Sequence, residues 1–251
     1  MPAPLEASGI SKRFGKTEAV VRASLAVGPG VALGLVGPNG SGKTTLLRCA
    51  SGLLRMDEGS SRILGHDVTL DHPAAMEGIA FVPELPAPFP SLTPMDHLRF
   101  AARVYRLGPG WEERAARILQ SLELSDRADH LCQELSKGQR QKVHLAEAML
   151  RDPPLVVLDE PLIGIDPKGV RVLKDFLREG VSKGRAYVLS SHTLPFVQEV
   201  CSRVAVIDHG RILADGTLDE LRSRSHAGGG TSLEDVFLKL TEAEPADGAL
   251  R

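Results

Sequence analysis

Long apolar runs, disulfide patterns and a surplus of one charge are all missing from this sequence of 251 residues. No run reaches the roughly 18 apolar residues that a spanning helix needs, so we expect no transmembrane segment. The first ten residues hold no basic stretch followed by an apolar one, and we expect no secretory signal peptide. Cys49, Cys132 and Cys201 form no CxxC pair, which favours free thiols in a reducing compartment.

The charges nearly cancel, with 30 Lys and Arg against 32 Asp and Glu and a formal net charge of -2. Such a balance gives no general attraction to nucleic acid or to an anionic membrane surface, so we expect no nucleic-acid partner. Hydrophobic residues make up 42% of the chain and charged residues 25%. Because these shares are ordinary for a soluble globular protein, we expect a buried core of normal size.

Strand and helix patterns alternate along the chain, as they do in an α/β protein with a largely parallel sheet. Short apolar runs predict buried strands at residues 31–36, 79–83, 155–158 and 186–191, and a hairpin over residues 204–214. Residues 94–107 and 111–124 carry apolar residues at helical spacing instead.

This change of pattern predicts how the chain is organised. We expect a core formed by residues 1–83 and 154–224, with a helical subdomain inserted at residues 84–153. Residues 225–251 are predicted to hold a Gly-rich linker, a short amphipathic helix over residues 233–240 and a polar tail.

A glycine-rich motif of the form GxxxxGKT lies between a predicted strand and a predicted helix. It consists of Gly37, Pro38, Asn39, Gly40, Ser41, Gly42, Lys43 and Thr44, and Thr45 follows it. Glycines let the backbone curl so that its N–H groups point at phosphate oxygens, and the helix N-terminus adds a positive end. Lys43 can reach the terminal phosphates, and the Thr44 hydroxyl can bind Mg²⁺. The alternative is a Gly-rich turn without a ligand, but the position between strand and helix favours a nucleotide site.

Two adjacent acids, Asp159 and Glu160, follow the apolar run at residues 155–158. They would emerge at the carboxyl end of a central strand, where α/β sheets bind ligands. Asp159 would hold Mg²⁺ through its water shell, and Glu160 would act as general base on the attacking water. A strand followed by two acids is common by itself, so the prediction depends on the nucleotide motif.

Residues 135–139, Leu-Ser-Lys-Gly-Gln, precede a helical run at residues 143–150 and resemble the LSGGQ signature of the ABC ATPases. Ser136 stands at an N-cap position, and by itself the segment would be an ordinary capped helix. It lies a short helix ahead of the Asp159 strand, as in that family. Lys137 departs from the usual glycine, whereas Gly138 and Gln139 are retained. The resemblance covers nearly the whole chain.

The resemblance assigns roles to further residues. Phe14 is similar to the aromatic that stacks on adenine, with an ordinary core phenylalanine as the alternative. Asp166 lies in a segment that resembles the D-loop and would reach across a dimer. His192 resembles the switch histidine that contacts the γ-phosphate and the attacking water. Glu84 replaces the family's usual glutamine; a carboxylate can still bind Mg²⁺ but cannot donate hydrogen bonds.

The family implies a P-loop NTPase: a RecA-like parallel sheet core with an antiparallel β part and an inserted helical subdomain. It implies ATP and Mg²⁺ as cofactors, with Glu160 and His192 as the catalytic pair. It also implies a head-to-tail homodimer, or a dimer with a related ABC subunit. In such a dimer each copy would complete its partner's site with Ser136, Gly138, Gln139 and Asp166.

A separate transmembrane permease is the other partner that the family implies, so the protein would be cytoplasmic and peripheral on the inner face of the cell membrane. Glu84, the Pro-rich loop after it and residues 232–238 resemble the branch that serves ABC-2-type exporters of drugs or antibiotics.

Two other functions stay open. A soluble ABC ATPase acting on nucleic acid or ribosomes would need no membrane partner, but such proteins usually carry two cassettes, a long coiled coil or a basic surface. A degenerate cassette would bind ATP without hydrolysing it, and the presence of both Glu160 and His192 argues against that.

Overall fold

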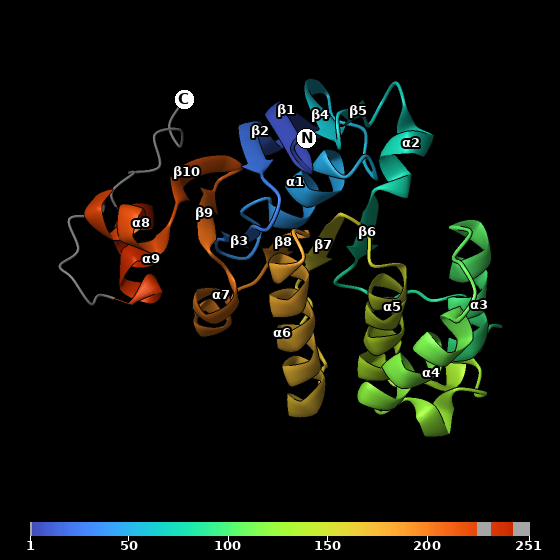
Figure 1. Ribbon diagram of the computed structural model, residues 1–251. Helices are drawn as coiled ribbons and strands as arrows, with labels where there is room; N and C mark the ends of the chain where they lie inside the picture. The colour runs from blue at the N-terminus through green and yellow to red at the C-terminus, as the bar shows by residue number, and fades with distance from the viewer. Residues whose placement is uncertain (1, 225–231, 243–251) are drawn as a thin grey trace.

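Two β-sheets and the helices around them make up the computed structural model, which describes residues 2–224 and 232–242 (Figure 1). The strands are β1 (Leu5–Phe14), β2 (Thr17–Val27), β3 (Ala32–Val36), β4 (Glu58–Ile63), β5 (His66–Asp67), β6 (Ile79–Val82), β7 (Leu155–Asp159), β8 (Ala186–Ser190), β9 (Arg203–Asp208) and β10 (Arg211–Gly216). The helices are α1 (Lys43–Ala50), α2 (His72–Glu77), α3 (Pro94–Val104), α4 (Trp111–Ser121), α5 (Lys137–Arg151), α6 (Pro167–Ser182), α7 (Leu194–Val200), α8 (Leu218–Arg224) and α9 (Leu233–Glu242), with 3-10 turns at Ser125–Arg127 and Cys132–Glu134.

The larger sheet has the strand order β10-β9-β3-β8-β7-β6, in which every neighbouring pair except β10 and β9 is parallel. Strands β3, β7 and β8 are buried at every position. Their continuous apolar runs follow from that burial, because helices or the other sheet cover both faces of a parallel sheet. The strand predictions from the sequence are confirmed, and so are the α/β class and the antiparallel part.

The smaller sheet is antiparallel, with the order β2-β1-β4-β5, and packs over α1. Leu25 of β2, Leu35 of β3, Leu46 of α1 and Ile63 of β4 share one buried cluster, which joins the two sheets. A second cluster fills the space between the larger sheet and the remaining helices, with Leu158 and Leu189 among its members. The first cluster fixes α1, and with it the loop before α1, against the larger sheet.

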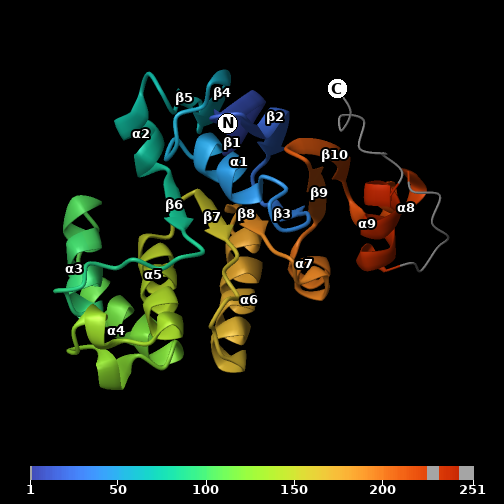
Figure 2. The ribbon, with the colours of Figure 1, turned by 180° about the vertical axis from the view of Figure 1, so that it is seen from behind.

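Helices α3, α4 and α5 lie between β6 and β7 in the chain, and they pack on one another. They stand at the end of the molecule opposite α8 and α9, as the two views show (Figures 1 and 2). Helix α5 begins at Lys137, earlier than the predicted run at residues 143–150, because Ser136 and Gln139 form a capping box there. The division of the chain into a core and a helical subdomain at residues 84–153 stays a prediction, and this placement supports it.

The structure describes only part of the C-terminal segment for which predictions were made. Helix α9 contains the predicted amphipathic helix, and its Leu233 and Val236 are buried against the core. Residues 225–231, which hold the predicted Gly-rich linker, and residues 243–251 of the predicted tail lie outside the described residues. Among the residues that are described, no helix combines the length and the apolar character needed to cross a bilayer. The three cysteines are free, and Cys49 and Cys132 are buried.

Candidate active site

Three neighbouring strands bring the predicted site residues together. Strand β8 lies between β3 and β7, and the register aligns Leu35 with Ser190 and Ser190 with Asp159. The glycine-rich loop follows β3, His192 follows β8, and Asp159 ends β7. Because the three strands are parallel, their carboxyl ends meet at one edge of the sheet. Residues that are far apart in the sequence therefore surround one space.

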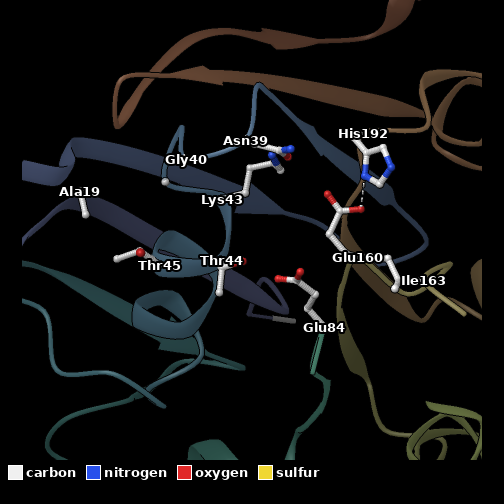
Figure 3. A pocket seen from close by; sticks show the side chains of 11 residues that line it. Ala19, Asn39, Gly40, Lys43, Thr44, Thr45, Glu84, Glu160, Ile163 and His192 are labelled. Carbon is white, nitrogen blue, oxygen red and sulfur yellow. Dashed lines mark hydrogen bonds and ion pairs between the residues drawn. The ribbon is translucent and has the colours of Figure 1, made fainter. Parts of the chain in front are cut away.

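A cavity of about 420 Å³ opens at this edge (Figure 3). Its walls come from the glycine-rich loop, β2 and the segments after β6, β7 and β8: Ala19, Asn39, Gly40, Gly42, Lys43, Thr44, Thr45, Glu84, Glu160, Ile163 and His192. Figure 3 shows Thr44, Glu84 and Glu160 around the same space. Ala19 and Ile163 were not predicted. Ile163 lies in the segment that resembles the D-loop, a usable signal, whereas nothing in the sequence marks Ala19.

The glycine-rich loop is held against β2 by close backbone contact. Gly42 has a φ of 104°, and a Cβ on it would lie 2.3 Å from the carbonyl oxygen of Ala19. Only glycine combines that backbone conformation with that approach. Gly37 is equally confined, since its Cβ would lie 2.2 Å from the Ile207 carbonyl oxygen. The loop therefore has one narrowly defined path from β3 into α1.

Lys43 is folded back over this loop. Its Nζ donates to the carbonyl oxygens of Gly37 at 2.8 Å and Pro38 at 2.9 Å. Burial lowers the pKa of Lys43, and the carboxylates of Glu160, Asp159 and Glu84 oppose that shift. The loop also contains a buried hydroxyl without a partner, that of Ser41. A cation and an unsatisfied donor beside a curled backbone suit phosphate oxygens.

Asp159 lies fully buried beneath the cavity rather than in its wall. Its Oδ1 accepts hydrogen bonds from Thr44 Oγ1 at 3.0 Å and from Ser190 Oγ at 2.7 Å. Its Oδ2 is buried and has no hydrogen-bond partner. An unsatisfied buried carboxylate oxygen is costly by itself, so this atom fits a cation or the water bound to one.

Glu160 turns away from the strand in a left-handed backbone conformation, with a φ of 47°. Its carboxylate Oε2 lies 2.9 Å from Nδ1 of His192. The Glu160 side chain is 8% exposed, whereas that of His192 is 60% exposed. The two atoms lie within hydrogen-bond distance, with Nδ1 as the donor in the tautomer that carries the ring proton there. The pair thus places a buried carboxylate next to an accessible imidazole in the wall of the cavity.

Several predicted site residues lie outside this cavity. Phe14 at the end of β1 is half exposed, which excludes the alternative of a core phenylalanine. Ser136 and Gln139 cap α5, and Asp166 caps α6. Gly138 lies so close to the segment after β7 that a Cβ on it would come within 1.9 Å of the Gly164 carbonyl oxygen. The structure therefore does not bring these residues into their own chain's cavity.

Comparison with known proteins places the chain in a family. Residues 20–163 match the family model described as ABC transporter. The daunorubicin/doxorubicin resistance ATP-binding protein DrrA of Streptomyces peucetius is 35% identical over 222 residues, which cover 87% of this chain and 67% of that protein. The SkfA peptide export ATP-binding protein SkfE of Bacillus subtilis (strain 168) is 34% identical over 84% of this chain and 88% of its own length.

Solved structures agree with the sequence relatives. The ATP-binding subunit of an ABC transporter superposes with a TM-score of 0.90 at 31% identity, covering 94% of this chain and 99% of that one. The ADP conformation of another ABC transporter's ATP-binding cassette gives a TM-score of 0.73 at 26% identity, covering 95% and 99%. The chain therefore belongs to the ABC transporter family, in which it is an ATP-binding subunit and an ATPase.

Proposed function

We propose that this chain hydrolyses ATP at the cavity beside the glycine-rich loop and uses the energy to drive export by a separate membrane subunit. The single observation that carries the proposal is the Glu160–His192 pair, with Nδ1 2.9 Å from Oε2, directly beside the loop that holds Lys43. Phosphoryl transfer needs positioned charges and a base for the attacking water, and this edge of the sheet supplies both.

The nucleotide would lie along the glycine-rich loop. Lys43 and the backbone of residues 37–45 would bind the phosphates, with the start of α1 adding the positive end of its dipole. Phe14, at the end of β1, would stack on the adenine. Its ring is half exposed, with Lys12 Nζ 5.6 Å from the ring centroid, and stacking of a base on such a ring contributes roughly 1–3 kcal/mol.

Mg²⁺ fits the acidic side of the cavity. Thr44, Asp159 and Glu84 provide the hydroxyl and carboxylate oxygens that this ion prefers, and Asp159 Oδ2 has no other partner. Bound Mg²⁺ would neutralise charge on the phosphates. Glu160 would take the proton of the attacking water, and His192 would hold that carboxylate in place through Nδ1.

A complete site would need a second copy. Ser136, Gly138, Gln139 and Asp166 lie at the starts of α5 and α6, outside the cavity of their own chain. In a head-to-tail dimer, with itself or with a related subunit, the capped end of α5 would face the γ-phosphate of the partner. Two-fold symmetry would then form two such sites.

A permease subunit would dock beside Glu84. Leu85, Phe89, Phe100 and Val104 are large apolar side chains that stay exposed on the loop after β6 and on α3. Phe89 and Phe100 contact each other edge to face, with centroids 5.8 Å apart. Such a group is typical of a protein interface. Docking there would hold the protein at the cytoplasmic face of a membrane and link the helical subdomain to transport.

Export rather than import is favoured by the relatives, which are described as serving drug resistance and peptide export. The competing function, a soluble ABC ATPase acting on nucleic acid or ribosomes, has less support because the net charge is -2. Co-purification from membranes with a permease would favour export, and co-purification with ribosomes would favour the competitor.

The catalytic part is tested by phosphate release from the purified chain. We expect Mg²⁺-dependent release that Lys43→Ala abolishes and that Lys183→Ala, a change at an exposed lysine after the far end of α6, leaves intact. Absence of any release, with and without membranes that hold the permease, would refute hydrolysis.

A further inference from the structure

We propose that Ser190 is a positioning residue for ATP hydrolysis, holding both acids at the end of β7 with one hydroxyl. The inference rests on the proposed function, because it concerns how Asp159 and Glu160 are kept in their working positions. Neither the sequence motifs nor the family resemblance assigned Ser190 a role.

The place of Ser190 in the sheet explains how one residue reaches both acids. It is the last residue of β8, fully buried, and paired in register with Asp159 on the neighbouring parallel strand. Leu35 of β3 is its partner on the other side. Ser190 thus lies between the strand that leads into the glycine-rich loop and the strand that carries the acids.

As a donor, the Ser190 hydroxyl makes a hydrogen bond to Asp159. Oγ donates to Asp159 Oδ1 at 2.7 Å, which is shorter than the 3.0 Å bond from Thr44 to the same atom. Thr44 is also the hydroxyl proposed to bind Mg²⁺. Ser190 is therefore the donor that can hold Oδ1 while Thr44 is engaged elsewhere, and Oδ2 is left as the carboxylate oxygen without a partner.

As an acceptor, the same hydroxyl takes a hydrogen bond from Glu160. The backbone N–H of Glu160 donates to Ser190 Oγ at 2.9 Å. Glu160 adopts a φ of 47°, a conformation that non-glycine residues hold only when their surroundings enforce it. A hydroxyl can donate once and accept at the same time, so the two bonds do not compete.

The strand end that carries Ser190 also carries His192, whose Nδ1 contacts the Glu160 carboxylate. Glu160 is therefore held from β8 at two points, its backbone by Ser190 and its side chain by His192. Without the serine hydroxyl, the Glu160 N–H and Asp159 Oδ1 would each lose a buried partner. The orientation of both acids would loosen, although each would still be present.

The test compares Ser190→Ala with Ser61→Ala, a matched control. Ser61 is also a buried serine on a strand; its Oγ donates to the Ala50 carbonyl at 2.7 Å, outside the cavity. We expect both changes to lower the melting temperature. Only Ser190→Ala should lower kcat, by roughly 10- to 100-fold, the effect of losing a hydrogen bond to a charged group. The KM for ATP should change much less, and Ser190→Thr, which keeps the hydroxyl, should recover part of the loss.

A second measurement follows nucleotide binding and does not depend on ATP hydrolysis. In a Glu160→Gln background, we expect Ser190→Ala to raise the Mg²⁺ concentration needed for half-maximal binding of a fluorescent ATP analogue, and Ser61→Ala to leave it unchanged. Where Ser190→Ala fails to fold, Ser190→Cys takes its place with the same expectations. Wild-type kcat and Mg²⁺ dependence in the Ser190 variant would overturn this inference alone. A wild-type chain without ATPase activity would instead refute the proposed function.

Discussion

Lys142 Nζ in α5 lies 2.5 Å from Asp166 Oδ2, the carboxylate that caps α6. The lysine side chain is 5% exposed and the aspartate side chain 45% exposed. The same Asp166 accepts the backbone N–H of Gly169 through Oδ1 at 2.7 Å. Together with the contact between Gly138 and Gly164, this ion pair ties the start of α5 to the start of α6. Both segments proposed to face a partner subunit are thus joined within one chain.

Because Lys142 is more buried than Asp166, substitutions at the two residues should lower the free energy of unfolding by different amounts. Asp166→Asn keeps a cap for α6 but leaves a buried ammonium without its counter-charge, so we expect a loss of roughly 1–2 kcal/mol. Lys142→Met removes the buried charge and keeps the apolar stem, while Asp166 stays solvated, so the loss should be smaller. Urea unfolding of the two variants measures both losses of unfolding free energy. A larger loss for Lys142→Met would contradict this account.

The Asp166 pair also predicts a dependence on pH. The hydrogen bond from Lys142, helped by that from Gly169, holds the pKa of Asp166 below its usual value. The unfolded chain therefore binds the proton at a higher pH than the folded chain, and stability contributed by Asp166 is lost as the pH falls through the folded pKa. From about pH 5 to about pH 3, wild-type stability should fall more steeply than that of Asp166→Asn. Parallel unfolding curves for the two proteins across this range would show that the pair contributes nothing.

The glycine-rich loop allows a matched comparison of two glycines. A Cβ at Gly42 would lie 2.3 Å from the Ala19 carbonyl oxygen, whereas a Cβ at Gly40 would meet nothing within 4 Å. Both have positive φ, so Gly40→Ala should carry only the strain of a left-handed alanine, about 1 kcal/mol. Gly42→Ala should in addition push the loop off β2 and weaken ATP binding at least roughly tenfold more than Gly40→Ala. Nucleotide titration measures the ATP affinity of both variants. Equal affinities would mean that the contact of Gly42 with β2 does not shape the site.

Phe14 should matter for affinity more than for folding. Its ring is half exposed on β1, so Phe14→Ala removes little buried area and should change the melting temperature little. Loss of stacking on the base should weaken ATP binding by roughly 5- to 150-fold without abolishing it. Phe100→Ala, at another half-exposed ring, is the control and should leave the affinity unchanged. The prediction fails if both variants bind ATP like the wild type.

Glu160 carries the chemical step in this account. Glu160→Gln keeps the size of the side chain but removes the base, so turnover should fall by roughly 10²–10⁴-fold while ATP binding persists. Glu112→Gln, at an acid in the first turn of α4 far along the chain from the cavity, should turn over normally. Steady-state phosphate release measures both. Near-normal turnover by Glu160→Gln would assign the base to another group.

Much of the fold could be predicted because parallel strands such as β7 are continuous apolar runs between loops. The smaller sheet was harder to place from the residues, since β1 pairs with β2 and β4 through register shifts and β4 is mostly exposed. Its presence was expected only from the family. The N-cap of α5 at Ser136 was predicted and is confirmed, whereas the apolar pattern marked only residues 143–150, because the first residues of α5 are polar.

The candidate site could be predicted where a motif is local, as in the glycine-rich loop and the adjacent acids. What could not be predicted are contacts between segments distant in the chain. Ser190 meets Asp159 only because β8 and β7 are neighbours in register, and Lys142 meets Asp166 only because α5 and α6 start side by side. A serine at a strand end and a lysine in a helix carry no signal of such partners.

In the proposed dimer, the Ser136 segment of one chain completes the ATP site at the glycine-rich loop of the other. Sedimentation velocity of Glu160→Gln, with and without ATP and Mg²⁺, detects this dimer, because the variant should bind ATP without consuming it. We expect a monomer without nucleotide, a dimer with it, and a weaker dimer when Ser136→Ala is added. A Glu160→Gln protein that stays monomeric while saturated with ATP would contradict the account.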